Sequence, residues 1–143
     1  MAVFSRKPKA TKLQTLDELN PMLRSGKPVL LDLMQVGCAP CKVMDGIINE
    51  LASEYGESAH IVKVDVAKVP GAAQAFKVRS TPTFVLLGSA PAKMSKKARQ
   101  RAAKQGGQPR KKSGQITPRW RTTGLVKKDA LQGVLESNGA TRA

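Results

Sequence analysis

The sequence VLLDLMQVGCAPC, at residues 29–41, joins a buried-strand pattern to two closely spaced cysteines. Five of its first six residues are apolar, and Pro28 and Gly37 flank the run, which is typical of a strand buried on both faces. The exception is Asp32. Beyond Cys41, apolar residues recur at steps of three and four and predict a helix that reaches about Tyr55; they are Val43, Met44, Ile47, Ile48, Leu51 and Tyr55.

The two cysteines are expected at the start of this helix, where the surroundings favour an ionised thiol. The first turn of a helix presents unpaired N–H groups and the positive end of the helix dipole, and both favour an anion. Cys38 is therefore expected to be the better thiolate. Pro40 fits the first turn without losing a hydrogen bond, and it turns Cys41 back toward Cys38. The sequence thus predicts a pair that can close a disulfide.

The rest of the chain alternates between helical and strand patterns. Thr15, followed three residues later by Glu18, is a capping-box pattern and predicts a short helix that ends at about Ser25. Residue spacing and β-branched content predict the other elements. These are a short edge strand at 12–14, strands at 60–66, 83–87 and 116–123, a short helix at 70–76 and a closing helix around 130–135. Together they predict an α/β fold in which helices sandwich a mixed central β-sheet.

Length and composition limit the class of protein. The chain has 143 residues, enough for one domain with one core. Two cysteines and one histidine cannot form a four-ligand zinc site of Cys and His within one chain. No apolar run approaches the roughly 20 residues of a membrane span, and residues 1–16 lack the continuous apolar region of a secretory signal. We expect a cytoplasmic monomer without membrane contact, although the basic start of the chain leaves an organellar transit segment open.

Two basic segments account for the net charge of +15. Residues 1–16 contain four Lys or Arg and residues 89–123 contain eleven, with no acid in either segment. We expect a basic, flexible N-terminus at 1–10 and a basic, flexible insertion at about 89–114, because the insertion has no apolar stripe from which to form a core. Its cations predict contacts with RNA, DNA or a ribosome, and a solvated loop that aids solubility is the other interpretation. These cations are Lys93, Lys96, Lys97, Arg99, Arg101, Lys104, Arg110, Lys111 and Lys112.

Four features together resemble the thioredoxin family. They are the motifs LLDLMQVGCAPCK, VKVDVAKVP and FKVRSTPTFVLL, and Gly124 before the last helix. The resemblance covers about residues 11–88 and 114–138, and it implies a thioredoxin fold for residues 11–138 with a flexible C-terminus at 139–143. It also implies a protein-disulfide reductase without a cofactor, whose partners are disulfide-containing proteins and a reductase that supplies electrons. The alternative is a thioredoxin-fold binding module anchored to a polyanion by the basic insertion.

The resemblance implies roles for individual residues. Cys38 would be the attacking thiolate and Cys41 the buried resolving thiol. Asp32 would lie under Cys41 and take part in its deprotonation, with Lys63 modulating Asp32 electrostatically. The cis residue Pro82 would lie beside the dithiol, and the backbone of Thr81 would pair with an extended substrate. Further substrate-binding positions would be Gly37, Ala39, Pro40 and Gly124.

Departures from the family pattern concern the surface around the cysteines. Gly37 and Met34 stand where thioredoxins usually have Trp, Gly46 stands where a helix-kinking Pro is typical, and Ala39 replaces the usual Gly. The surface that meets partners has therefore lost aromatic area. This loss argues against recognition by an ordinary thioredoxin reductase but not against exchange chemistry.

Several single residues allow two interpretations. The cysteines could instead be a structural pair, or half of a metal or iron–sulfur site between subunits. Burial would raise the pKa of Asp32 and make it a proton acceptor near neutral pH, but Asp32 could also be a satisfied polar group in the core. Strand alternation places Lys63 at the surface as readily as beside Asp32. Trp120, between two arginines, could cover the sheet edge or stack on a base.

Overall fold

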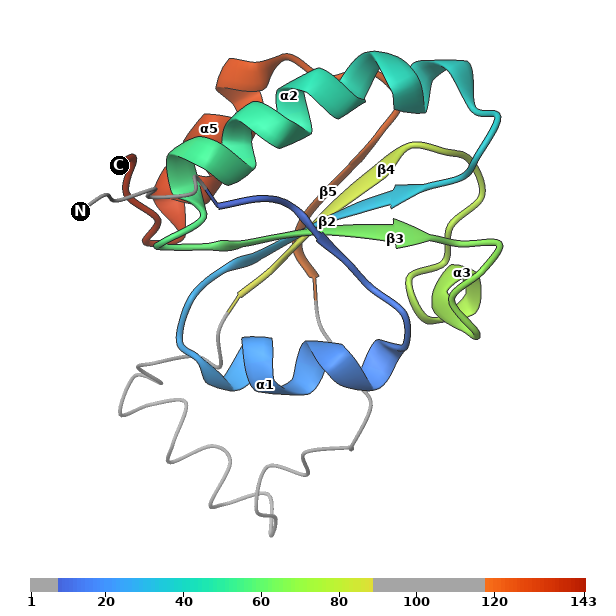
Figure 1. The fold of residues 1–143 in the computed structure, drawn as a ribbon, viewed down its shortest axis with the longest axis horizontal. Coiled ribbons are helices and arrows are strands. Elements are labelled where there is room, and N and C mark those ends of the chain that lie inside the picture. Colours follow the sequence, from blue (N-terminus) through green and yellow to red (C-terminus); the bar gives the residue numbers. More distant parts are fainter. Residues whose placement is uncertain (1–7, 89–117) are drawn as a thin grey trace, which may run out of the picture.

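A mixed β-sheet forms the middle layer of the protein (Figure 1). The computed structural model describes residues 8–88 and 118–143, and within these residues the sheet has five strands in the order β1-β3-β2-β4-β5. Strands β1 and β2 run parallel to β3, β4 is antiparallel to β2, and β5 is antiparallel to β4. Their bounds are Thr11–Lys12 (β1), Val29–Met34 (β2), His60–Asp65 (β3), Thr83–Leu87 (β4) and Pro118–Thr123 (β5).

Two long helices cover one face of the sheet. Helices α2 (Ala39–Tyr55) and α5 (Lys128–Ser137) lie above it in Figure 1. The apolar stripe of α2 packs on alternate residues of the strands, such as Leu30, Ile61 and Phe84, and forms one of two buried clusters. Trp120 of β5 is half-buried against this cluster. It therefore covers the edge of the sheet, which supports the first of the two interpretations of this residue.

The opposite face of the sheet carries the shorter helices. A 3-10 turn, η1 (Leu16–Glu18), leads directly into α1 (Leu19–Arg24), and α3 (Ala72–Ala75) follows β3. These elements pack on the other set of alternating strand residues, Leu31, Leu33 and Val85 among them, to form the second buried cluster. Because a strand sends successive side chains to opposite faces, β2 contributes to both clusters. This explains the nearly continuous apolar run of its sequence.

Most expected elements occur, with shifted ends. The Glu18 carboxylate accepts the N–H groups of Gln14 and Thr15, both at 2.9 Å, which is the Glu18 half of the predicted capping box. The expected edge strand at 12–14 is instead Thr11–Lys12, and the closing helix is longer than expected. The edge position of β5 is confirmed, although residues 116 and 117 of the expected strand lie outside the described residues.

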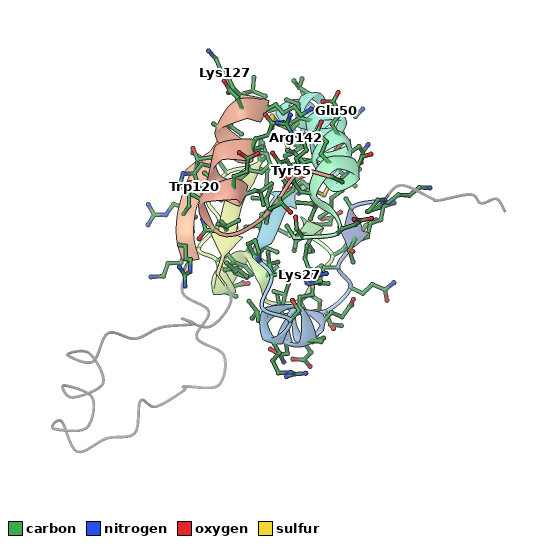
Figure 2. All side chains as sticks on the ribbon, turned by 90° about the vertical axis from the view of Figure 1, so that its left-hand side faces the viewer. Lys27, Glu50, Tyr55, Trp120, Lys127 and Arg142 are labelled. Atoms are coloured by element: carbon green, nitrogen blue, oxygen red, sulfur yellow. A yellow bond between two sulfur atoms is a disulfide. The ribbon has the colours of Figure 1, made fainter. Side chains whose placement is uncertain are left out.

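The C-terminal residues 139–143, expected to be flexible, are docked on the fold. Ala140 is buried, and the N–H of Ala143 donates to the Glu54 carbonyl at 2.8 Å. The guanidinium of Arg142 lies 6.0 Å from the ring centre of Tyr55, and Figure 2 shows both side chains near α2 and α5.

The strand residues on either side of the basic insertion lie at the other end of the sheet from the cysteines. Leu87 pairs with Pro118 at one end of the β4–β5 ladder, whereas Thr83 pairs with Thr123 at the other, next to Pro82. The predicted flexible insertion and its nine cationic residues, like residues 1–7 of the N-terminus, lie outside the described residues. In the part that is described, no helix has the length and apolar character needed to cross a membrane.

Candidate active site

A disulfide joins Cys38 and Cys41 at the start of α2, with 5.2 Å between their Cα atoms. Cys38 is the N-cap of the helix, and its Sγ accepts the N–H of Cys41 at 3.2 Å. Cys41, one turn further, is 2% exposed, whereas Cys38 is only half-buried. At the N-cap, the unpaired N–H groups and the positive end of the helix dipole stabilise a negative charge on the sulfur. The pair is thus asymmetric, with the better stabilised sulfur nearer to solvent.

The peptide bond between Thr81 and Pro82 is cis, as expected from the resemblance, and it lies beside the disulfide. The Sγ atom of Cys38 is 3.5 Å from the carbonyl oxygen of Thr81. Across the next loop, the N–H of Gly124 donates to the Pro82 carbonyl at 2.8 Å. Gly124 has φ +80°, in the left-handed region that glycine adopts without strain. Residues far apart in the sequence therefore meet at one end of the sheet.

Gly37 also has a left-handed backbone, with φ +89°. It ends a turn in which the N–H of Cys38 donates to the Gln35 carbonyl at 3.2 Å. A side chain at this position would meet no neighbouring atom within 4 Å, so space does not demand glycine here. The backbone angle does, because L-residues other than Asn and Asp rarely adopt it.

Asp32 is buried in the middle of β2 beneath α2. It is 1% exposed, and among the described residues neither carboxylate oxygen has a hydrogen-bond partner. Alternation along β2 directs it to the face on which Leu30 packs against α2. Burial in this apolar setting raises the pKa of Asp32 to about 7, while the charge of Lys63 lowers it and the charge of Asp45 raises it. The interpretation of Asp32 as a satisfied polar group is therefore wrong.

Lys63 lies beside Asp32, because the two residues are register partners on β3 and β2. Its ammonium group forms an ion pair with Asp45 of α2, with 3.1 Å between Nζ and Oδ1. The Lys63 side chain is 17% exposed and that of Asp45 is 41% exposed. The charge of Lys63 therefore acts on two carboxylates, because Lys63 forms an ion pair with Asp45 and also lowers the pKa of Asp32.

Asp45 was not among the residues singled out from the sequence. The signal was present, since Asp45 follows Cys41 by four residues and therefore lies on the same face of α2. What sequence reasoning lacked was the register that brings Lys63 under that face.

Three exposed aliphatic side chains are near the disulfide residues or Gly124 in the sequence, and two of them, Val36 and Leu125, were not singled out from the sequence. Val36 is 70% exposed, Val43 63% and Leu125 62%, and each lies close in the sequence to Gly37, Cys41 or Gly124. Val43 counted toward the apolar periodicity that predicts α2, yet its side chain is exposed, so not every residue of that pattern faces the core. Ala39 and Pro40 are likewise exposed. The surface around the cysteines lacks Trp but is still apolar.

Comparison with known proteins places this site in context. The thioredoxin family model matches residues 10–107. Thioredoxin Y1, chloroplastic, of Arabidopsis thaliana is 38% identical over 76 residues, which cover 52% of this chain and 44% of that protein. Thioredoxin of Mycolicibacterium smegmatis is 39% identical over 85 residues, which cover 57% of this chain and 76% of that protein. The chain spans about half the length of the first curated relatives that it matches.

A solved structure agrees in fold. A mutant thioredoxin from Halobacterium salinarum NRC-1 superposes with a TM-score of 0.67 over 95% of this chain and 96% of that chain, at 23% sequence identity. The family model, the relatives and the shared fold agree with the disulfide at the head of α2. The chain belongs to the thioredoxin family.

Proposed function

We propose that this chain is a thiol-disulfide oxidoreductase that reduces the disulfides of partner proteins through Cys38 and Cys41. The observation that carries the proposal is the asymmetry of the pair. Cys38 caps α2 and is half-buried, whereas Cys41 is buried one turn further along the helix. Thiol exchange needs a thiolate that can attack and a second thiol that can release the mixed disulfide. The two positions supply these two needs.

The exchange proceeds in two steps that balance in atoms and electrons. In the reduced form, the Cys38 thiolate attacks one sulfur of a partner disulfide, so that a mixed disulfide forms and a partner thiolate leaves. Cys41 then loses its proton and attacks Cys38 Sγ, which releases the second partner thiolate. The partner has gained two electrons, and the protein is left with its Cys38–Cys41 disulfide. A reductase that supplies two electrons, of unspecified identity, returns the pair to the dithiol.

Asp32 is the proposed acceptor for the Cys41 proton. A carboxyl group with a pKa of about 7 is partly ionised at neutral pH, so it can take a proton and give it up again. Lys63 would tune this equilibrium through its charge, and Asp45 would limit the effect by holding the Lys63 ammonium. A buried carboxylate without hydrogen-bond donors costs stability, and groups with pKa values shifted in this way cluster at functional sites.

The partner is expected to dock on the apolar surface around Cys38. Its extended chain would pair with the backbone of Thr81, next to Pro82, and would contact the exposed side chains of Val36, Val43 and Leu125. The remaining proposed contacts are backbone or small side chains, which permit close approach; they are Gly37, Ala39, Pro40 and Gly124. Aliphatic rather than aromatic contacts favour an unusual reductase partner.

Trapping tests the proposal. Cys41→Ser keeps the attacking thiol but cannot resolve the mixed disulfide. This variant should therefore accumulate covalent adducts with disulfide-containing proteins, and dithiothreitol should cleave these adducts by reduction. Cys38→Ser is the matched control, since its remaining thiol is buried and should form few adducts. Equal adduct formation by the two variants, or none by Cys41→Ser, would refute the assignment of roles.

The remaining features of the proposal concern place and partners. We propose a cytoplasmic location, because the reducing conditions of the cytoplasm suit a dithiol, and a monomeric state. We also propose RNA, DNA or a ribosome as partners of the basic insertion. The last of these is tested by deletion of residues 90–113, which should abolish retention on RNA at low salt if the insertion binds it. Retention that survives the deletion would exclude the insertion as the contact.

A further inference from the structure

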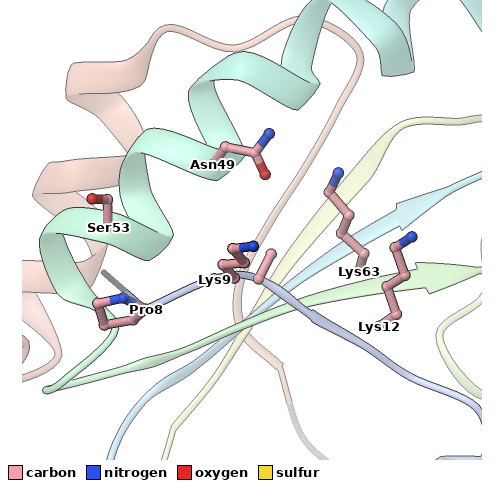
Figure 3. A pocket seen from close by; sticks show the side chains of 7 residues that line it. Pro8, Lys9, Lys12, Asn49, Ser53 and Lys63 are labelled. Atoms are coloured by element: carbon pink, nitrogen blue, oxygen red, sulfur yellow. The ribbon is translucent and has the colours of Figure 1, made fainter. Parts of the chain in front are cut away.

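A pocket of about 870 Å³ lies on the α2 side of the sheet, at the edge formed by β1 and β3 (Figure 3). Its volume falls in the range of small-molecule sites, about 300–1,000 Å³. Figure 3 shows Lys12 and Lys63 extending from neighbouring strands, with Asn49 on α2 nearby. The lining residues are Pro8, Lys9, Ala10, Lys12, Asn49, Ser53 and Lys63.

The walls of this pocket are anchored to the fold. Lys12 is the register partner of Lys63 in the parallel ladder of β1 and β3, and the N–H of Leu13 donates to the Lys63 carbonyl at 2.9 Å. Ala10 packs against the buried cluster under α2. Asn49 and Ser53 are four residues apart on α2, so they lie on one face of the helix. The pocket is therefore preformed rather than dependent on a ligand to order it.

The charge of the pocket is positive and largely uncompensated. Among the described residues, Lys63 pairs with Asp45, while Lys9 and Lys12 have no carboxylate partner. No acidic side chain lines the pocket. Like charges on neighbouring strands destabilise a sheet, and Asp45 offsets only the charge of Lys63, so a further anion near Lys12 would relieve the remaining repulsion. Three lysines and one neighbouring aspartate leave a net charge of about +2.

We propose that this pocket binds the phosphate group of a small phosphorylated molecule, with Lys9, Lys12 and Lys63 as its cationic contacts. A phosphate monoester carries a charge of about −1.5 to −2 at neutral pH, which matches the net charge of the site. Lysine ammonium groups bind phosphate as point charges, and the Asn49 amide and Ser53 hydroxyl are neutral donors. The volume exceeds that of a phosphate group alone, so the organic part of the ligand also has room.

Calorimetric titration of the full chain tests the site, with glucose 6-phosphate as the phosphate monoester and glucose as its neutral control. The Lys9→Gln/Lys12→Gln double variant removes the two unpaired cations and leaves Lys63 and the cysteines in place. The matched control is Lys68→Gln/Lys127→Gln, which removes the same charge from two exposed positions outside the pocket. This control separates the pocket from the general attraction of a strongly basic chain for anions. Inorganic phosphate is the third titrant.

The expected result is binding of glucose 6-phosphate but not glucose, and a loss of about tenfold or more in affinity for Lys9→Gln/Lys12→Gln, because two charge-assisted contacts disappear. The control pair should change the affinity by less than about twofold at moderate salt. Inorganic phosphate that binds more weakly than the ester, or equally well, supports the site and shows how far recognition extends beyond phosphate. Absence of binding by the wild type, or equal losses in the two double variants, would overturn the proposal.

Discussion

Replacing Asp32 by Asn should change the pH dependence of stability more than any other single substitution in the sheet. Burial raises the pKa of Asp32 from 3.8 to about 7 in the folded state, while the unfolded chain keeps the lower value. Between these values the folded protein holds a proton that the unfolded chain has lost, so the free energy of unfolding falls as the pH rises. At about 1.36 kcal/mol for each pKa unit, the loss amounts to about 4 kcal/mol. Asn does not ionise, so the Asp32→Asn variant should lack this fall in the free energy of unfolding.

The assay is urea unfolding of the oxidised protein, in which the cysteines do not titrate, at several values between pH 4 and pH 8. The free energy of unfolding of Asp32→Asn minus that of the wild type should grow by about 4 kcal/mol across this range. Any constant cost of burying the Asn amide cancels from that change. Asp17→Asn, at an exposed position, is the control and should show no comparable trend. A difference for Asp32→Asn that stays within about 1 kcal/mol at all pH values would contradict the reasoning.

Four further predictions test other parts of the structure. Asp45→Asn removes a charge that raises the pKa of Asp32, and it frees Lys63 to lower that pKa further. The carboxyl carbon resonance of Asp32 should therefore titrate at lower pH in this variant. An unchanged or higher midpoint would count against the ion pair. Gly46→Ala should stabilise by about 0.5–1 kcal/mol in urea unfolding, since helix α2 leaves a Cβ there unobstructed. The same change at Gly56, where a Cβ would overlap Pro8, or at Gly37, where φ is +89°, should destabilise by about 1–3 kcal/mol, and a gain at either position would refute the stated geometry. Deletion of residues 139–143 should cost about 1–2 kcal/mol, because the burial of Ala140 and the contact of Arg142 with Tyr55 are lost; unchanged stability would mean that the docked segment contributes nothing.

The central elements of the fold could be predicted because their patterns are local. The run at 29–34 and the run at 83–87 each have the bounds expected from sequence, since a strand buried on both faces leaves a continuous apolar signal. Helix α2 was predicted from another local pattern, the spacing of apolar residues at steps of three and four. The exposure of Val43 was not, because Val43 lies beside the stripe formed by Cys41, Met44 and Ile48, and apolar spacing does not fix where the buried face of a helix ends.

The chemistry of the site could be predicted only where one motif carries it. Cys38 and Cys41 are close in the sequence and define their own geometry, and the thioredoxin resemblance supplied Pro82. The position of Lys63 depends on the register of β3 against β2, which alternation alone leaves ambiguous. Asp45 needed that register as well as the face of α2, so it emerged only from the structure. The docking of residues 139–143 depends on long-range contacts that leave no periodic signal.

The central claim is that the Cys38–Cys41 dithiol exchanges with partner disulfides although the flanking tryptophans are absent. The most direct test is the initial rate at which the reduced protein reduces a protein disulfide in the presence of dithiothreitol, compared with Cys38→Ser under the same conditions. The account predicts a rate well above the dithiothreitol background for the wild type and a background rate for the variant. A wild-type rate equal to the background would contradict it.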